Sequence, residues 1–109
     1  MKRILAIIVL AATLVSCSSI PAGMNKETYD VGVEALSWCE RYDNGKITDD
    51  DLVKKMDDLY DKLESPQDTK YTTSYLEVGG CLVTIGSIRY GDKTKFFDGY
   101  EKLKKALGK

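Results

Sequence analysis

Four segments of the chain carry apolar residues at intervals of three and four, and this repeat constrains the fold more than any other feature. The interval matches the 3.6 residues per turn of an α-helix, so the apolar side chains of each segment share one face. The segments cover residues 27–42 and the stretches that follow Thr48, Ser65 and Asp92. The predicted inward residues, in chain order, are Tyr29, Val33, Leu36, Cys39, Leu52, Met56, Leu59, Leu63, Tyr71, Tyr75, Val78, Leu82, Ile85, Phe96, Tyr100, Leu103 and Leu107.

In the third segment the signal for the start of the helix is the clearest, but glycines make the middle of the helix the weakest. In "SPQD", Ser65 suits an N-cap and Pro66 suits the first helical position. Glycines at 79, 80 and 86 each weaken the helix by up to about 1 kcal/mol relative to alanine. A strand over residues 81–85 is the alternative, but a single strand has no evident partner. We therefore predict an all-α fold, a small antiparallel bundle of about four helices in one domain.

The N-terminus has the features of an export signal. Lys2 and Arg3 precede an uncharged apolar run of twelve residues, from Ile4 to Val15. As a helix this run extends only about 18 Å, too short to span a hydrocarbon core of about 30 Å. It is therefore typical of the apolar region of a secretory signal peptide.

The stretch "LVSC", Leu14 to Cys17, resembles the lipobox of bacterial lipoproteins. The resemblance covers residues 1–17 and implies that residues 1–16 are cleaved and that Cys17 is acylated, for instance with palmitate. The lipid then anchors the protein without spanning the membrane. Ser18 resembles the outer-membrane sorting residue, so we expect the outer membrane, facing the periplasm, in a Gram-negative host. Elsewhere we expect the outer face of the cell membrane; an ordinary signal peptide is the alternative.

Cleavage leaves the 93 residues from Cys17 to Lys109, with 14 basic and 17 acidic side chains and a net charge of −3. This balance argues against nucleic acid and against an anionic lipid surface as partners. Residues 17–26 are predicted to be the lipidated cysteine and a short tether, and residues 27–109 the helical domain.

Two cysteines remain once Cys17 is assigned to the anchor. An even pair in an exported chain favours a disulfide between Cys39 and Cys81. In the chain-entropy model, closing this loop stabilises a domain by about 4 kcal/mol. Two buried free thiols are the alternative. We predict the disulfide.

The stretch from Glu40 to Asp51 resembles part of an EF-hand calcium loop, with Gly45 at the sixth position. Tyr42 then occupies a ligand position without a carboxylate, which weakens the match. The same residues also fit a helix that ends near Gly45 and another that begins after a threonine cap. We expect a turn. Calcium is the lesser alternative, with Glu40, Asn44, Thr48 and Asp51 as its ligands.

No other arrangement of residues indicates catalysis. The chain has no histidine, so sites built on histidine as base or metal ligand are excluded. Asp57, Asp58 and Asp61 lie near lysines at spacings that suit solvent-exposed ion pairs. The "GGC" stretch lacks the preceding strand of a phosphate-binding loop. We predict a protein that is not an enzyme and needs no cofactor.

Aromatic residues are the remaining functional signal. Seven tyrosines, two phenylalanines and one tryptophan occur in 109 residues, and several fall beside the inward faces. Tyrosine and tryptophan suit protein interfaces because they combine a large apolar area with one polar group. The edge of the core is the alternative place for them. The candidate partner-binding residues are Trp38, Tyr42, Tyr60, Tyr90 and Phe97.

Two classes of function fit these features. The first is a protein-binding module at the cell envelope, of the inhibitor, immunity or exclusion type, with a protein partner of unknown identity. The second is a structural or assembly lipoprotein of the envelope. A small-ligand carrier ranks third, because four short helices leave little room for a pocket of about 300 Å³.

The lipid anchor gives the first testable prediction. Cys17→Ala should abolish incorporation of labelled palmitate, because the acylated sulfur is removed. Cys39→Ala, which keeps the lipobox, serves as the control and should be labelled as the natural chain is. Continued labelling of the Cys17 variant would remove the anchor assignment.

Overall fold

The computed structural model describes residues 20–109, and over these residues the chain is all-helical, which confirms the predicted fold class. Four α-helices form the bundle: α2 (Lys26–Asp43), α3 (Asp49–Lys62), α4 (Thr72–Gly86) and α5 (Thr94–Ala106). Two 3₁₀ turns, η1 (Thr69–Tyr71) and η2 (Ser87–Tyr90), flank α4. In this part of the chain no helix has both the length and the apolar character needed to cross a membrane. The predicted signal peptide and Cys17 lie outside the described residues.

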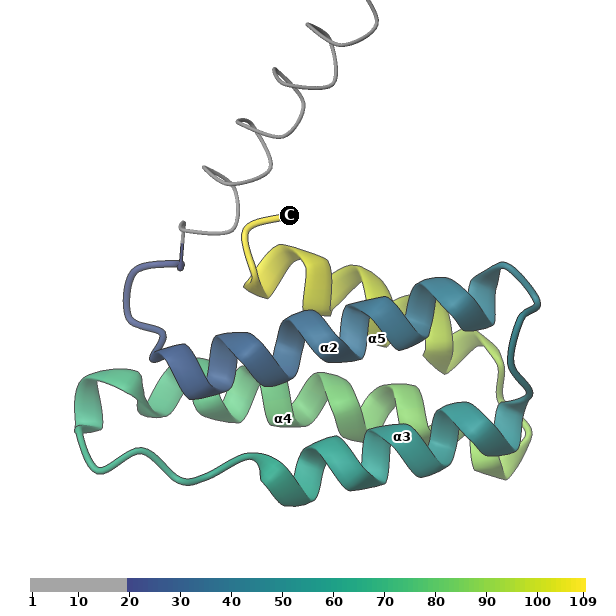
Figure 1. Ribbon diagram of the computed structural model, residues 1–109, viewed down its shortest axis with the longest axis horizontal. Coiled ribbons are helices and arrows are strands. Elements are labelled where there is room, and N and C mark those ends of the chain that lie inside the picture. Colours follow the sequence, from purple (N-terminus) through teal and green to yellow (C-terminus); the bar gives the residue numbers. More distant parts are fainter. Residues whose placement is uncertain (1–19) are drawn as a thin grey trace, which may run out of the picture.

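Successive helices run in opposite directions (Figure 1). α2 and α4 each contact all three other helices, whereas α3 and α5 do not contact one another. α2 and α4 therefore form the central pair of the bundle, with α3 and α5 on its two sides. The largest fully buried side chains come from every helix and include Leu52, Met56, Leu59, Leu82, Ile85, Phe96 and Leu103.

The inward faces predicted for the second and fourth helices are confirmed, apart from Leu63 and Tyr100, which are only half-buried. The face of α2 differs at Val33, which is 37% exposed. Gly32 is buried in its place, and a Cβ built on Gly32 would lie 2.7 Å from Cδ2 of Leu107. The close approach of Leu107 at the end of α5 thus selects the glycine for the buried face of α2.

The predicted start of the third helix at Ser65 and Pro66 is wrong. Residues 63–68 form the connection after α3, and α4 begins only at Thr72. The carboxylate of Asp68 accepts the N–H of Lys70 at 3.1 Å and caps η1 instead. A helix starting at Ser65 would leave only two residues to reverse the chain, fewer than most helix connections use.

The N-terminal segment of the described chain, residues 20–25, packs against the bundle. Met24 is buried at 5% exposure, and Ser74 Oγ on α4 donates to the carbonyl of Gly23 at 2.8 Å. Asn25 caps α2 by accepting the N–H of Thr28 at 3.1 Å. From Pro21 onward this part of the predicted tether is therefore held on the domain. The C-terminus lies nearby (Figure 1).

At Gly99, α5 packs directly against the backbone of α4. A Cβ built there would lie 2.6 Å from Cγ1 of Ile85, 3.0 Å from N of Ile85 and 3.2 Å from the carbonyl oxygen of Cys81. Two of these three atoms belong to the α4 backbone, which cannot move aside as a side chain can. Only glycine lets α5 approach α4 this closely.

We therefore expect Gly99→Ala to lower the free energy of unfolding by about 1–3 kcal/mol, as overpacked cores do. Gly80→Ala is the matched control, because no atom lies within 4 Å of a Cβ at Gly80. That variant should be neutral or stabilising by up to about 1 kcal/mol, the gain in helix propensity. Urea unfolding followed by circular dichroism measures both. Equal effects of the two variants would contradict the proposed contact.

Candidate protein-interaction surface

The loop between α2 and α3 uses its polar side chains to cap helices. Thr48 Oγ accepts the N–H of Asp51, and the Asp51 carboxylate accepts the N–H of Thr48, both at 3.2 Å. Gly45 has φ +73°, the left-handed conformation that suits a glycine after a helix end. Asn44 is the C-cap of α2, and Glu40 lies within that helix. The geometry is that of the expected turn.

Tyr42, the third position of the calcium alignment, also has a structural partner. Its hydroxyl donates to Oδ1 of Asp49 at 2.7 Å. Partial burial, together with this hydrogen bond, raises the pKa of Tyr42 to about 12. Among residues 20–109 no three acidic or cysteine side chains group together in a way that could hold a metal ion.

The structure has Cys39 and Cys81 as free thiols and does not contain the predicted disulfide. Both side chains are buried, at 0% and 5% exposure, and serve as small apolar residues of the core. The thiols lie near enough that Cys81 contributes to the raised pKa of Cys39. The sequence could place both cysteines in the core. It could not show whether they are bonded to each other, because an even cysteine count gives no information on disulfide geometry.

Burial raises the pKa of Cys39 to about 12 and that of Cys81 to about 11, from an ordinary value of 9.0. Since only the thiolate is a nucleophile, both thiols are far less nucleophilic at pH 8 than an exposed cysteine. We expect slow alkylation of both thiols in the folded, reduced protein, with Cys39 the slower.

Iodoacetamide labelling resolved by mass spectrometry tests this, with the protein unfolded in urea as the control. The rates of alkylation should rise with pH throughout the range from 8 to 10, because this range lies below the pKa of both thiols. Equal labelling of folded and unfolded protein would contradict the burial. If protein isolated without reductant contains a bond between Cys39 and Cys81, the predicted disulfide would be supported after all.

The five aromatic candidates lie in three separate places. Trp38, half-buried on α2, lies between two cations: Arg41 Cζ is 4.5 Å and Lys55 Nζ 4.7 Å from its ring centroid. Tyr42 and Phe97 flank the buried ring of Phe96, with centroids 4.7 and 5.1 Å from it. Trp38 and Tyr42 therefore have structural partners within the bundle.

Tyr60 and Tyr90 occur together with apolar residues of α4 that sequence analysis missed. Leu76 and Val83 are 63% and 58% exposed, beside Tyr60 at 48% and Tyr90 at 82%. Tyr60, Leu76 and Val83 line a hollow of about 340 Å³ between α3 and α4. A second hollow of about 250 Å³ continues from Tyr60 and Val83 to Tyr90. We call this surface the α3–α4 groove, defined by Tyr60, Leu76, Gly80, Val83 and Tyr90.

The groove exists because α4 is apolar on two sides. Val78, Cys81, Leu82 and Ile85 face the core, while Leu76 and Val83, seven residues apart, are exposed on another side. An interval of seven is about two helical turns, so these two residues lie in one row of α4. Tyr90, in η2, lines the same hollow as Val83. The interval of seven between Leu76 and Val83 is visible in the sequence. It was missed because residues 81–85 could also be interpreted as a strand.

Glycines shape the floor of the groove. A Cβ built on Gly79 would lie 3.5 Å from Cε2 of Tyr60, so the ring packs directly over the α4 backbone. A Cβ on Gly80 would meet no atom within 4 Å, so this position is open to a molecule from outside. The floor between Leu76 and Val83 is therefore low enough for another chain to approach the helix backbone.

An ion pair lies at the far end of the groove. Arg89 in η2 donates from Nη2 to Oδ1 of Asp57 on α3 at 2.6 Å, and from Nε to the carbonyl of Gly86 at 3.0 Å. The hydrogen bond with Asp57 raises the pKa of Arg89. The pair links the end of α4 to α3 and leaves Tyr90 beside it, largely exposed.

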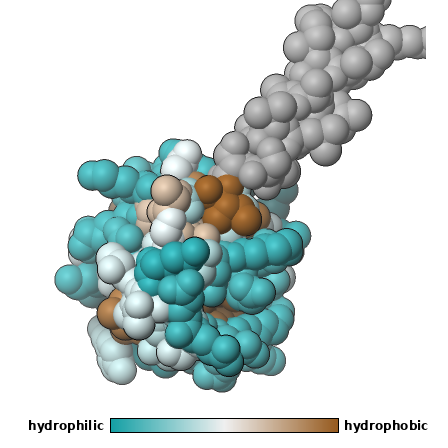
Figure 2. Space-filling view, turned by 90° about the vertical axis from the view of Figure 1, so that its left-hand side faces the viewer, coloured by the Kyte–Doolittle hydropathy of each residue, from teal (hydrophilic) through white to brown (hydrophobic). Residues whose placement is uncertain are grey.

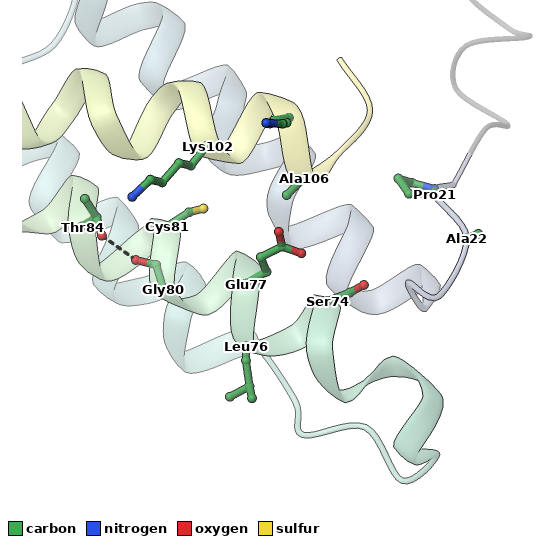
Figure 3. A pocket seen from close by; sticks show the side chains of 11 residues that line it. Pro21, Ala22, Ser74, Leu76, Glu77, Gly80, Cys81, Thr84, Lys102 and Ala106 are labelled. Carbon is green, nitrogen blue, oxygen red and sulfur yellow. Dashed lines mark hydrogen bonds between the residues drawn. The ribbon is translucent and has the colours of Figure 1, made fainter.

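A larger hollow, of about 750 Å³, lies on the other side of α4, between α4, α5 and the N-terminal segment. Leu76 and Gly80 of the groove also line this hollow, although Figure 3 shows the Leu76 side chain pointing away from Lys102. The hollow is open to solvent, and its volume lies within the range of about 300–1,000 Å³ that small-molecule pockets have. At this end of the bundle most of the surface is hydrophilic (Figure 2).

Comparisons of the chain with protein-family models, with curated proteins and with solved structures found no match.

Proposed function

We propose that this chain is a lipid-anchored protein of the cell envelope that binds another protein through the α3–α4 groove and carries out no catalysis itself. The exposed apolar row of α4 is the observation that carries the proposal. A monomeric domain gains nothing in stability from exposing Leu76, Val83 and Tyr90 side by side, whereas a protein partner would bury them.

The composition of the groove fits a protein partner. Tyr60, which lines both hollows, and Tyr90, at one end, provide large, amphipathic contact areas, and such residues dominate binding energies in protein interfaces. The open backbone at Gly80 provides the depression into which a side chain or a helix of the partner can pack. An apolar surface that is open at its centre is typical of helix-in-groove recognition.

Two acidic residues close to Tyr60 in the sequence favour a partner with basic residues around its apolar face. Asp61 and Glu64 follow Tyr60 at one and four residues and form no ion pair within residues 20–109. Lysine or arginine residues of a partner would complement these carboxylates and would increase the association rate.

The anchor supports the cellular location of this activity. The lipobox resemblance at residues 14–17 implies an acylated Cys17, and only two residues, Ser18 and Ser19, separate Cys17 from the first described residue, Ile20. The bundle would then remain at the membrane surface, where its partner would be another envelope protein. Ser18 favours the outer membrane, facing the periplasm, in a Gram-negative host.

The test is co-purification from cross-linked envelopes. Val83→Asp places a charge in the middle of the apolar row and should reduce recovery of the partner at least tenfold, because the charge must be buried in the complex. Val33→Asp is the matched control, since Val33 is an exposed valine on α2, away from the groove. It should leave recovery unchanged.

Equal recovery with both variants would contradict binding through the groove. Absence of any specific partner from cross-linked envelopes would contradict the binding module itself and would favour the structural role instead.

A further inference from the structure

We infer that the lysine-rich end of α5 docks on anionic phospholipid headgroups and thereby fixes the orientation of the bundle on the membrane. The surface consists of Lys102, Lys105 and Lys109, which we call the lysine face. The inference rests on the proposed lipid anchor, but it does not depend on which protein the groove binds.

The charge of the chain is distributed very unevenly. Residues 92–109 carry six lysines and three acidic side chains, a net charge of +3. Residues 20–91 carry eight basic and fourteen acidic side chains, a net charge of −6. From Lys102 to Lys109 there are four lysines and no acidic side chain. The overall net charge of the chain therefore conceals one strongly basic part.

Ion pairs within the protein leave much of this basic charge free. Lys104 pairs with Glu101 at 2.9 Å and lies over the ring of Tyr100, with its Nζ 4.5 Å from the centroid. Lys102 pairs with Asp98 at 3.3 Å, but its side chain is 64% exposed. Lys105 and Lys109 form no ion pair within residues 20–109.

The lysine face lies beside the point where the anchor joins the domain. Lys102 and Lys105 line the same hollow as Pro21 and Ala22 (Figure 3). A Cβ built on Gly108 would lie 3.8 Å from Cγ of Pro21, so the end of the chain also adjoins this segment. The segment that leads to the proposed anchor and the lysines therefore lie on the same side of the bundle.

The chain between anchor and domain is short. Three residues lie between Cys17 and Pro21, and the four Cα–Cα steps that join them reach at most about 14 Å at full extension. The potential of an anionic bilayer decays over a Debye length of about 8 Å at physiological ionic strength. Extended side chains of lysine can cross much of the remaining distance. Charge complementarity therefore selects the lysine face for the bilayer surface.

The helix dipole explains only part of the pattern. Lysines in the last turn stabilise a helix through its negative C-terminal end, which accounts for Lys104 and Lys105. It does not account for Lys109 beyond the helix, for the absence of acidic side chains after Glu101, or for the position next to Pro21. A membrane-facing role accounts for all three.

The experiment uses the full, acylated protein added from detergent to preformed vesicles. One set is phosphatidylcholine alone, and in the other phosphatidylglycerol replaces about a third of the lipid. After flotation, an impermeant amine-reactive reagent is applied and the modification of each lysine is measured by mass spectrometry. Lys54 and Lys62 on α3 are the internal controls, because both are exposed and unpaired.

We expect Lys102, Lys105 and Lys109 to react severalfold more slowly on the anionic vesicles, with Lys54 and Lys62 unchanged and the difference lost at high salt. Lys105→Glu combined with Lys109→Glu should abolish the protection of Lys102. Lys54→Glu combined with Lys62→Glu, the matched control, should preserve it. Neither pair of substitutions breaks an ion pair within the described residues.

Equal lysine reactivity on the two kinds of vesicle would overturn this inference and leave the proposed binding module intact. Failure of the protein to float with either kind of vesicle would overturn the anchor, and the orientation with it. Protection of Lys54 and Lys62 in place of the lysine face would show that the opposite side of the bundle meets the lipid, which also contradicts the inference.

Discussion

The contact of Gly99 with the backbone of α4 is the packing constraint on which the rest of the structure depends. It lets α5 lie against Ile85 and Cys81 and close one side of the bundle. The end of α5 then reaches Gly32 of α2 through Leu107, which joins α5 to the second central helix. Because α3 and α5 do not contact each other, both pack against the central helices α2 and α4.

This arrangement gives the bundle two sides of different chemistry. Between α3 and α4 the surface is apolar, with Leu76, Val83 and two tyrosines around an open glycine. Between α4 and α5 lie Lys102 and Lys105, next to the segment that leads to the proposed anchor. In the proposed account, the lysines face the lipid and the groove stays accessible to an envelope protein. Orientation on the membrane would reduce the entropic cost of binding a partner in the same membrane.

Sequence periodicity predicted the helices well where propensity and packing agree. The inward residues Leu52, Met56 and Leu59 follow from the repeat alone, and Thr48 with Asp51 follows from capping chemistry. Periodicity failed to predict the features that depend on contacts between helices. Leu107 selects Gly32 over Val33 for the buried face of α2, and the α3–α4 connection takes up Ser65 and Pro66. Of the groove, only Tyr60 and Tyr90 were predicted, because a single helix with two apolar sides resembles a buried strand in the sequence.

The most direct test of the central claim is site-specific photo-crosslinking in intact cells, with a photoreactive residue in place of Val83 and, separately, of Val33. The account predicts a discrete adduct with one envelope protein from position 83 and none from position 33. Adducts of equal yield at both positions, or none from position 83 while other surfaces react, would contradict a protein-binding role for the α3–α4 groove.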